Sequence, residues 1–350
     1  MTLRYLLLLC CAWGGLLIGC PTTPCECPDD DTAADDDASA DDDASGDDDT
    51  SADDDTSADD DTSGGDDDTT ADPGQDADGD GYTIGDGDCD DGNEDVNPGA
   101  EEACGNEVDD DCDGIVDYGC RILIPEGEFQ MGAEEDVGAS DQRPKHAVWL
   151  DAYLIDKYET TVRYYKECEQ AGVCNAPRFV KSFDRDHYYD DDTYLDYPVI
   201  YIQRDDARAY CDWVGGYLTT EAQWEKAARG DQDERLYPWG DWYDCSFGNA
   251  NWCVGETVRV GSYPLNLSPY GVADMAGNVW EFFEDFYAPN YYASSPYENP
   301  TGPPAGQNLS YRGGAFTWWG NPTVSVRHPA RELGSSFYNI GFRCAYDEAS

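Results

Sequence analysis

Residues 218–230 read LTTEAQWEKAARG, and this stretch predicts a helix whose start is marked by its own side chains. Thr220 and Gln223 have the spacing of a capping box, in which a threonine and a glutamine satisfy free backbone amides of the first turn. Trp224, Ala227 and Ala228 recur at helical spacing, so we expect these three side chains to face a core. The stretch therefore predicts an amphipathic helix inside a globular domain.

The elements predicted around this helix are short. A second amphipathic helix is predicted upstream by apolar residues at the i, i+3, i+4, i+7 spacing, namely Ala207, Tyr210, Cys211 and Val214. Alternation over residues 148–154 predicts a strand that presents Val148, Leu150, Ala152 and Leu154. Beyond about residue 235, periodic runs are scarce and Gly, Pro, Asn, Tyr and Trp dominate. We therefore expect much ordered loop, which disulfides or bound cations would stabilise.

An ordered series of motifs runs from residue 121 to the end of the chain. The motifs are IPEGEFQMG at 124–132, IDKYETT at 155–161, AYC at 209–211, LTTEAQWEKAARG at 218–230, YPWG at 237–240, DMAGNVWE at 274–281, RGGAF at 312–316 and GFRC at 341–344. In this order they resemble the formylglycine-generating enzyme family, also called the sulfatase-modifying factor family. The resemblance covers residues 121–350. It implies an α+β fold of the C-type-lectin-like type with low regular secondary structure.

Six cysteines of this region are expected to form disulfides. The family resemblance implies that Cys211 pairs with Cys344, and a pair of buried thiols is the alternative. For Cys168 with Cys174, and for Cys245 with Cys253, local pairing is the economical choice, because each pair would close one short loop. The chain has 15 cysteines, a number typical of an oxidising compartment.

The residues that carry the family's chemistry are missing. The family oxidises a cysteine of a sulfatase peptide to formylglycine with O₂, using copper that two thiolates hold as Cu(I). The resemblance places those thiolates at positions 318 and 323, where this sequence has Trp318 and Thr323. No cysteine occurs between Cys253 and Cys344. Since neither indole nor hydroxyl suits Cu(I), we expect no copper and no catalytic residue of the family reaction.

The resemblance implies two other roles for residues near this segment. A structural calcium ion would bind through Asn278 and Glu281 of the Gly-Asn-x-Trp-Glu motif. The place of the lost cysteines would form a ligand-binding surface from Trp318, Trp319, Asn321, Arg327 and Arg331. Exposed aromatic and arginine side chains suit a peptide, a glycan or an envelope protein. The alternative is that both tryptophans belong to the core.

We therefore expect a non-catalytic binding or scaffold domain. The alternative is an oxidoreductase of the same family that acts on a protein or peptide substrate through a different site. Copper-dependent O₂ uptake in the presence of a thiol peptide would favour this alternative.

The N-terminal 120 residues have a different character. The chain has 76 acidic and 20 basic residues, a formal net charge of −56, and residues 1–120 hold 40 of the acids with a single base. This charge excludes a nucleic-acid-binding surface, which needs clustered Lys and Arg. Asp triplets begin at 29, 35, 41, 47, 53 and 59, separated by small residues that offer little to bury. Residues 20–73 are therefore predicted to be a disordered acidic tether.

The first residues predict a membrane anchor. Arg4 precedes an apolar run over residues 5–18, which ends in Leu-Ile-Gly-Cys at 17–20. This tetrapeptide resembles the lipobox of bacterial lipoproteins, so residues 1–19 are predicted to be a signal peptide and Cys20 a lipidated residue. Pro21, by analogy with enteric sorting rules, favours the outer membrane. We expect a lipid-anchored protein of the bacterial cell envelope; the alternative is an ordinary signal peptide with an incidental cysteine.

Residues 74–120 predict a small calcium module. The runs DADGDG at 76–81 and DDDCDG at 109–114 place alternate carboxylates before a glycine, as in the first half of a calcium loop. The segment resembles a metal-binding repeat of bacterial surface proteins, and its lack of His favours structural calcium over copper. The alternative is an acidic linker with turn glycines. The candidate ligands are Asp76, Asp78, Asp80, Asp109, Asp111, Asp113 and Asp117. The pairing of Cys89, Cys104, Cys112 and Cys120, and of Cys25 and Cys27, stays open.

Overall fold

The computed structural model describes residues 74–348, with gaps at 104–105, 107, 136, 232–234, 318–319, 330–333 and 335. All of these residues belong to one compact unit, Asp68–Ser350. The predicted signal peptide and the whole acidic tether, with Cys20, Cys25 and Cys27, lie outside the described residues, as does Cys104. No helix in the described part of the chain has the length and apolar character needed to cross a bilayer.

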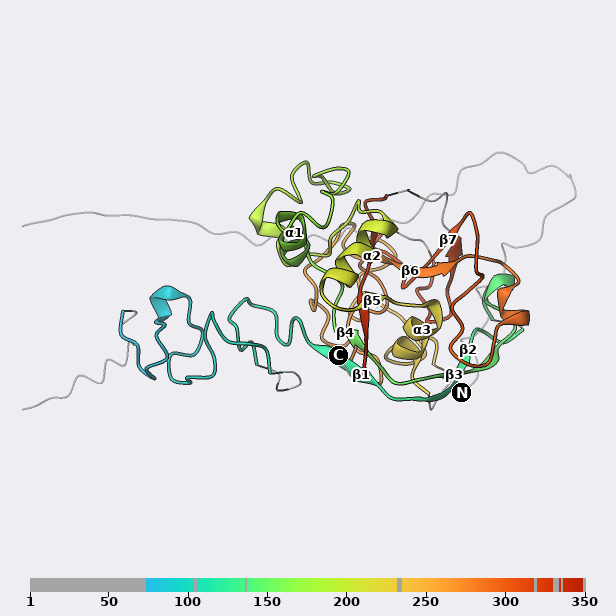
Figure 1. The fold of residues 1–350 in the computed structure, drawn as a ribbon, viewed down its shortest axis with the longest axis horizontal. Helices are drawn as coiled ribbons and strands as arrows, with labels where there is room; N and C mark the ends of the chain where they lie inside the picture. The colour runs from blue at the N-terminus through green and yellow to red at the C-terminus, as the bar shows by residue number, and fades with distance from the viewer. Residues whose placement is uncertain are drawn as a thin grey trace, which may run out of the picture. The chain divides into compact units, whose positions relative to one another are not determined.

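One sheet joins the beginning and the end of residues 121–350, which we call the large domain. Its strand order is β1 (Arg121–Ile124), β4 (Tyr153–Asp156), β10 (Cys344–Asp347) and β5 (Tyr217–Leu218), with all neighbours antiparallel. Ile155 of β4 pairs with Ile122 on one side and with Ala345 on the other. Figure 1 shows β1, β4 and β5 together beside the C-terminus.

A second four-stranded sheet has the order β8-β7-β6-β9. Its strands are β6 (Trp280–Phe286), β7 (Leu309–Arg312), β8 (His328–Pro329) and β9 (Ile340–Gly341). β6 and β7 are antiparallel, whereas β6 and β9 are parallel. A separate hairpin consists of β2 (Gly127–Met131) and β3 (His146–Leu150).

Three α-helices accompany the sheets: α1 (Val162–Gln170), α2 (Arg204–Trp213) and α3 (Glu221–Arg229). The capping box predicted for α3 is confirmed, because the Thr220 hydroxyl accepts the Gln223 amide at 3.2 Å and the Gln223 side chain accepts the Thr220 amide at 3.0 Å. Trp224, Ala227 and Ala228 are fully buried, as predicted. The short 3₁₀ helices are η1 (Ile84–Asp86), η2 (Ser140–Gln142), η3 (Asp192–Tyr194) and η4 (Tyr291–Ser294).

The strand predicted over residues 148–154 is instead two strands with different phases. Val148 and Leu150 are buried in β3, but in β4 the buried residues are Tyr153 and Ile155. Residues 151–152 belong to neither strand, so the chain leaves the β2–β3 hairpin there and enters the other sheet. The prediction that Leu154 lies on the same buried face as Val148 is therefore wrong, because this break shifts the alternation by one residue.

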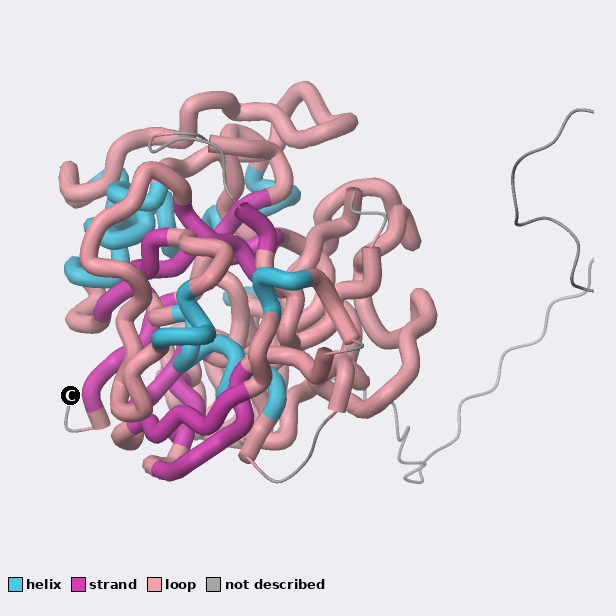
Figure 2. The backbone as a smooth tube through the Cα atoms, turned by 90° about the vertical axis from the view of Figure 1, so that its right-hand side faces the viewer, coloured by secondary structure: helices cyan, strands magenta, loops and turns pink. Residues whose placement is uncertain are grey.

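The α+β class and the low content of regular structure are confirmed. Figure 2 shows that loops and turns make up much of the tube around the short helices and strands. The predicted disulfides Cys211–Cys344, Cys168–Cys174 and Cys245–Cys253 are all present. In residues 74–120, which we call the acidic module, Cys89 pairs with Cys112. This resolves part of the open connectivity, and Cys120 is also disulfide-bonded.

Two side chains of the acidic module are buried in the core of the large domain. Ile115 and Tyr118 are buried in a cluster with Tyr158, Val260 and Ala273. The Tyr118 ring also stacks on Tyr164, with the ring centroids 4.6 Å apart. Residues 115–120 are thus packed against the large domain and do not behave as a free linker.

Candidate functional site

The segment after β7, where the family's cysteines map, is closely packed at its start. Gly313 has φ +89°, and a Cβ there would lie 3.3 Å from the Trp224 ring, so only glycine fits without adjustment. The Gly313 carbonyl accepts the Gly277 amide at 2.8 Å, and the Phe316 amide donates to the Asn278 carbonyl at 3.0 Å. This backbone is therefore held in place up to Phe316, whose side chain is fully buried.

The resemblance places the family's two cysteines at positions 318 and 323, and the structure describes only Thr323, since Trp318 and Trp319 lie outside the described residues. Its side chain is half-buried, and its hydroxyl lies 3.4 Å from the Ser325 hydroxyl. Hydroxyl oxygens are hard ligands that do not select Cu(I). Asn321, also predicted on the ligand surface, is exposed, and its carbonyl accepts the Thr323 amide at 2.9 Å.

The prediction that Arg327 lies on an exposed ligand surface is wrong. Its guanidinium is buried and forms a two-contact ion pair with Glu221, from Nε to Oε1 at 2.6 Å and from Nη2 to Oε2 at 2.8 Å. A third nitrogen donates to the Asp141 carbonyl at 2.8 Å. Arg327 points inward because Glu221, the first residue of α3, is buried in the core, where its negative charge is stabilised by a positive partner. Arg331 lies outside the described residues.

Arg327 is part of a larger buried network of charges. Arg312 lies between two glutamates of α3, with Nε 3.2 Å from Glu221 and Nη2 2.7 Å from Glu225. Burial alone raises the pKa of Glu221, but the charges of Arg327 and Arg312 outweigh it and hold this pKa at about 2. Asp285 accepts the Glu221 amide at 2.9 Å, and burial with the nearby Glu221 charge raises its pKa to about 8. Sequence periodicity missed this network, because charged residues of a helix are expected outside.

The predicted calcium ligands of the Gly-Asn-x-Trp-Glu motif have protein partners. Both oxygens of Glu281 accept hydrogen bonds from Arg343 at 2.9 Å, and Trp224 adds a third at 3.0 Å. The Asn278 side chain donates to Glu159 at 2.6 Å and accepts the Val258 amide at 3.0 Å. Asn278 and Glu281 are therefore held in a buried hydrogen-bond network, and their role as calcium ligands stays a prediction.

An exposed apolar patch borders the segment 312–327. Phe179, Val180 and Phe183 are 44–48% exposed, although they are large apolar residues. The Phe183 ring lies 6.3 Å from Phe316 and 5.2 Å from Tyr338, measured between centroids. Buried Glu256 fixes this loop, since it accepts the Ser182 hydroxyl at 2.7 Å and the Asp184 amide at 2.8 Å. Nothing periodic in the sequence indicates this patch.

A cavity of about 510 Å³ lies elsewhere on the large domain. Its wall includes Asp151, Tyr153, Arg208, Tyr217, Thr220 and Glu284, and none of the described residues of the segment 312–327 lines it. Arg208 is paired with Glu284 through two contacts of 2.9 and 2.6 Å. The cavity is therefore separate from the described part of that segment.

Two carboxylate clusters in the acidic module bring ligand atoms within 4.8 Å of one another. The first contains Asp76, Asp78 and Asp80, as the sequence predicts. In it, one oxygen of Asp78 and one of Asp80 are buried without a hydrogen-bond partner. Among the described residues, these two clusters are the only groups of three or more His, Cys, Asp or Glu close enough to share an ion.

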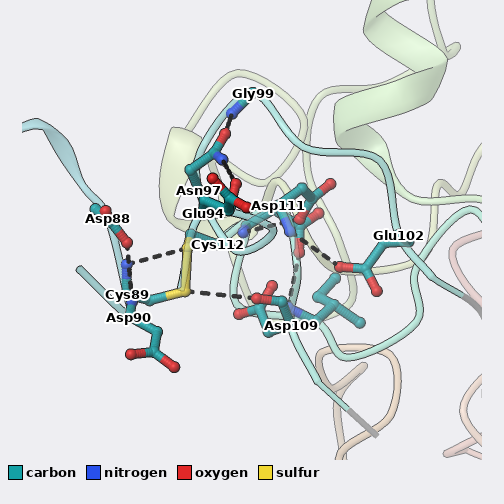
Figure 3. Close-up of a disulfide and its surroundings, with 12 residues drawn as sticks. Asp88, Cys89, Asp90, Glu94, Asn97, Gly99, Glu102, Asp109, Asp111 and Cys112 are labelled. Atoms are coloured by element: carbon teal, nitrogen blue, oxygen red, sulfur yellow. Dashed lines mark hydrogen bonds between the residues drawn. A yellow bond between two sulfur atoms is a disulfide. The ribbon is translucent and has the colours of Figure 1, made fainter. Parts of the chain in front are cut away.

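The second cluster differs from its predicted composition. It joins Asp109 and Asp111 to Glu102, which is not among the ligands predicted from the sequence (Figure 3). Glu102 folds back on the loop, where it accepts the Asp117 amide at 2.8 Å, and burial raises its pKa to about 7. Asp117 instead forms an ion pair with Lys157 of the large domain, so its carboxylate is set apart from the cluster. Asp113 keeps one buried oxygen without a partner beside this cluster, and burial raises its pKa to about 6.

Comparisons with known proteins match two overlapping parts of the chain. Residues 115–348 match the family model described as "Sulfatase-modifying factor enzyme 1-like domain", and residues 88–118 match one described as "Putative metal-binding motif". The formylglycine-generating enzyme of Bos taurus is 30% identical over 281 residues, which cover 65% of this chain and 74% of the relative. The inactive C-alpha-formylglycine-generating enzyme 2 of Bos taurus is 27% identical over 277 residues, covering 64% and 87%.

Other similar proteins carry different names. The serine/threonine-protein kinase pkn1 of Chlamydia pneumoniae is 33% identical over 238 residues, and the match covers 64% of this chain but only 37% of the kinase. Two solved structures share the fold: Treponema denticola variable protein 1, with a TM-score of 0.55 and 20% identity, and PvdO from Pseudomonas aeruginosa, with 0.54 and 23%. Each match covers 65% of this chain and 94% of the solved chain.

Proposed function

This chain belongs to the family of sulfatase-modifying factor enzyme 1-like domains, and from that premise we propose that it is a non-catalytic binding member of the family. The observation that carries the proposal is the pair Trp318 and Thr323, which stand where the family holds copper through two thiolates. No thiol lies between Cys253 and Cys344 to replace them. A bovine relative whose name includes the word inactive supports the idea that such members exist.

The surroundings of the lost site support binding without oxidation. The buried pairs of Glu221 with Arg312 and Arg327 hold both ends of the segment 312–327, so the scaffold does not depend on the missing cysteines. Beside it, Phe179, Val180 and Phe183 offer exposed apolar area that a ligand can bury. We infer that this face binds a peptide segment of an envelope protein.

The proposal predicts that the purified chain makes no formylglycine. When it is incubated with Cu(I), O₂ and a Cys-x-Pro-x-Arg peptide, mass spectrometry should show no aldehyde above a control without protein, because no soft donor holds the metal. Aldehyde above that control would contradict the proposal and favour an oxidoreductase with a different site. In the double variant Trp318→Cys/Thr323→Cys, we expect Cu(I) binding to appear, since the two thiols would restore soft ligands at both positions.

We also propose that Cys20 is lipidated and that the acidic residues after it extend the domain away from the bacterial outer membrane. The apolar run before Leu-Ile-Gly-Cys and the repeated Asp triplets support this. In cells labelled with a palmitate analogue, the chain should be labelled and should sediment with membranes. Cys20→Ala should lose both properties, and membrane association that survives in Cys20→Ala would exclude this anchor.

For the matched metal-binding motif, we propose that Glu102, Asp109 and Asp111 bind calcium as a structural ion. Their all-oxygen chemistry and the unpartnered oxygens of Asp109 and Asp113 support a hard cation. The ion would stabilise the loop that leads into Ile115 and Tyr118, which are packed against the large domain. Replacing Glu102 by Gln should remove this ion from the chain.

A further inference from the structure

The first acidic loop, residues 76–81, turns three carboxylates toward one point. Asp76 accepts the Gly79 amide at 2.7 Å and the Gly81 amide at 3.1 Å, which closes the loop on itself. Asp78 and Asp80 each use one oxygen to accept an amide, from Asp80 and Tyr82, respectively. The other oxygen of each is buried and lacks a partner. Burial of such an oxygen costs folding free energy unless a cation or a hydrogen-bond donor contacts it.

Asp88 supplies an independent observation. Its side chain is only 5% exposed, yet its Oδ2 has no hydrogen-bond partner, while Oδ1 accepts the Asp90 amide at 2.9 Å. The segment that holds Asp88 contacts the first loop, because the Ala77 amide donates to Asp91 at 3.1 Å. A buried carboxylate oxygen without a donor is stabilised by a positive ion, and the segment that carries this oxygen contacts the loop of three clustered carboxylates.

We propose that Asp76, Asp78, Asp80 and Asp88 bind one calcium ion, at a site separate from the cluster around Glu102. Asp76, Asp78 and Asp80 lie outside the matched metal-binding motif, which begins at residue 88. Four carboxylates and no nitrogen or sulfur ligand favour calcium over a transition metal. Calcium takes six to eight oxygens, so main-chain oxygen and water would complete its shell.

The ion would have a mechanical role in this chain. Asp88 precedes Cys89, whose disulfide to Cys112 anchors it to the rest of the module (Figure 3). Calcium shared by Asp88 and the loop at 76–80 would therefore join the N-terminal end of the described chain to this disulfide. The site would order the point at which the acidic residues that precede it meet the folded module.

Calorimetric titration of the full chain with calcium tests the proposal. The wild type should bind one more ion than Asp88→Asn, or should bind that ion about tenfold more tightly, because the variant loses one ligand charge. Asp95→Asn is the matched control, because Asp95 is an exposed aspartate of the same module outside both clusters. It should bind calcium like the wild type.

The outcomes separate this site from the one proposed around Glu102. If Glu102→Gln loses one ion and Asp88→Asn loses another, the proposals for both calcium sites are confirmed. If only Glu102→Gln loses an ion, the present inference is overturned and the calcium site of the matched motif stands. Hydrogen exchange of the wild type gives a check that needs no variant: calcium should slow exchange over residues 76–91, and unchanged exchange at millimolar calcium, the weak end of extracellular sites, would also overturn it.

Discussion

Replacement of Arg327 by methionine should lower the free energy of unfolding by about 3–5 kcal/mol. The substitution keeps much of the side-chain volume but removes the charge that neutralises Glu221, whose side chain is 2% exposed. Arg312 remains 3.2 Å from the same carboxylate, but it also forms an ion pair with Glu225. When one of its two arginine partners is removed, the negative charge of the buried Glu221 carboxylate is poorly compensated. Urea unfolding followed by tryptophan fluorescence measures the effect.

Lys166→Met is the control, because Lys166 pairs with an aspartate whose side chain is 86% exposed. Surface pairs of this kind contribute about 0–1 kcal/mol. If Arg327→Met costs no more than Lys166→Met, the buried pair does not stabilise the domain.

The pH dependence of the Arg327→Met effect identifies its cause. The folded state holds the pKa of Glu221 at about 2, below the ordinary 4.5, so the pairing stabilises the domain above pH 4.5 and is lost as the pH falls toward 2. The difference in stability between the wild type and Arg327→Met should therefore shrink as the pH falls through this window. A constant difference would indicate lost packing and not a lost ion pair.

Removal of the Cys211–Cys344 disulfide should cost about 5 kcal/mol, from the entropy that a cross-link of this span removes from the unfolded chain. The two cysteines are 133 residues apart, and both are fully buried. Cys344 begins β10, which lies between β4 and β5, so the bond ties α2 to an inner strand of the sheet. We expect Cys211→Ala/Cys344→Ala to unfold at a much lower urea concentration than the wild type.

The Cys168–Cys174 disulfide provides the comparison for this prediction. It spans only 6 residues, so the double variant Cys168→Ala/Cys174→Ala should cost about 2 kcal/mol by the same relation. Equal losses for the two pairs would show that loop length does not determine their contribution.

Local patterns in the sequence determined several features correctly. The capping box of Thr220 and Gln223 and the buried positions of α3 follow from contacts within one or two turns of a helix. The disulfides at Cys168–Cys174 and Cys245–Cys253 join near neighbours in the chain. The sequence also shows that positions 318 and 323 hold Trp and Thr, and the proposal that the chain binds no copper rests on these two residues.

Tertiary structure alone decided where the charges lie. Arg327 was predicted at a surface, and it pairs instead with Glu221, 106 residues away, because the fold buries that carboxylate at the start of α3. The second carboxylate cluster is a similar case, since Glu102 meets Asp109 and Asp111 only after the chain turns back. Helical and strand periodicity is set by contacts within a few residues. The partner of a buried charge is set by long-range packing, which no local pattern records.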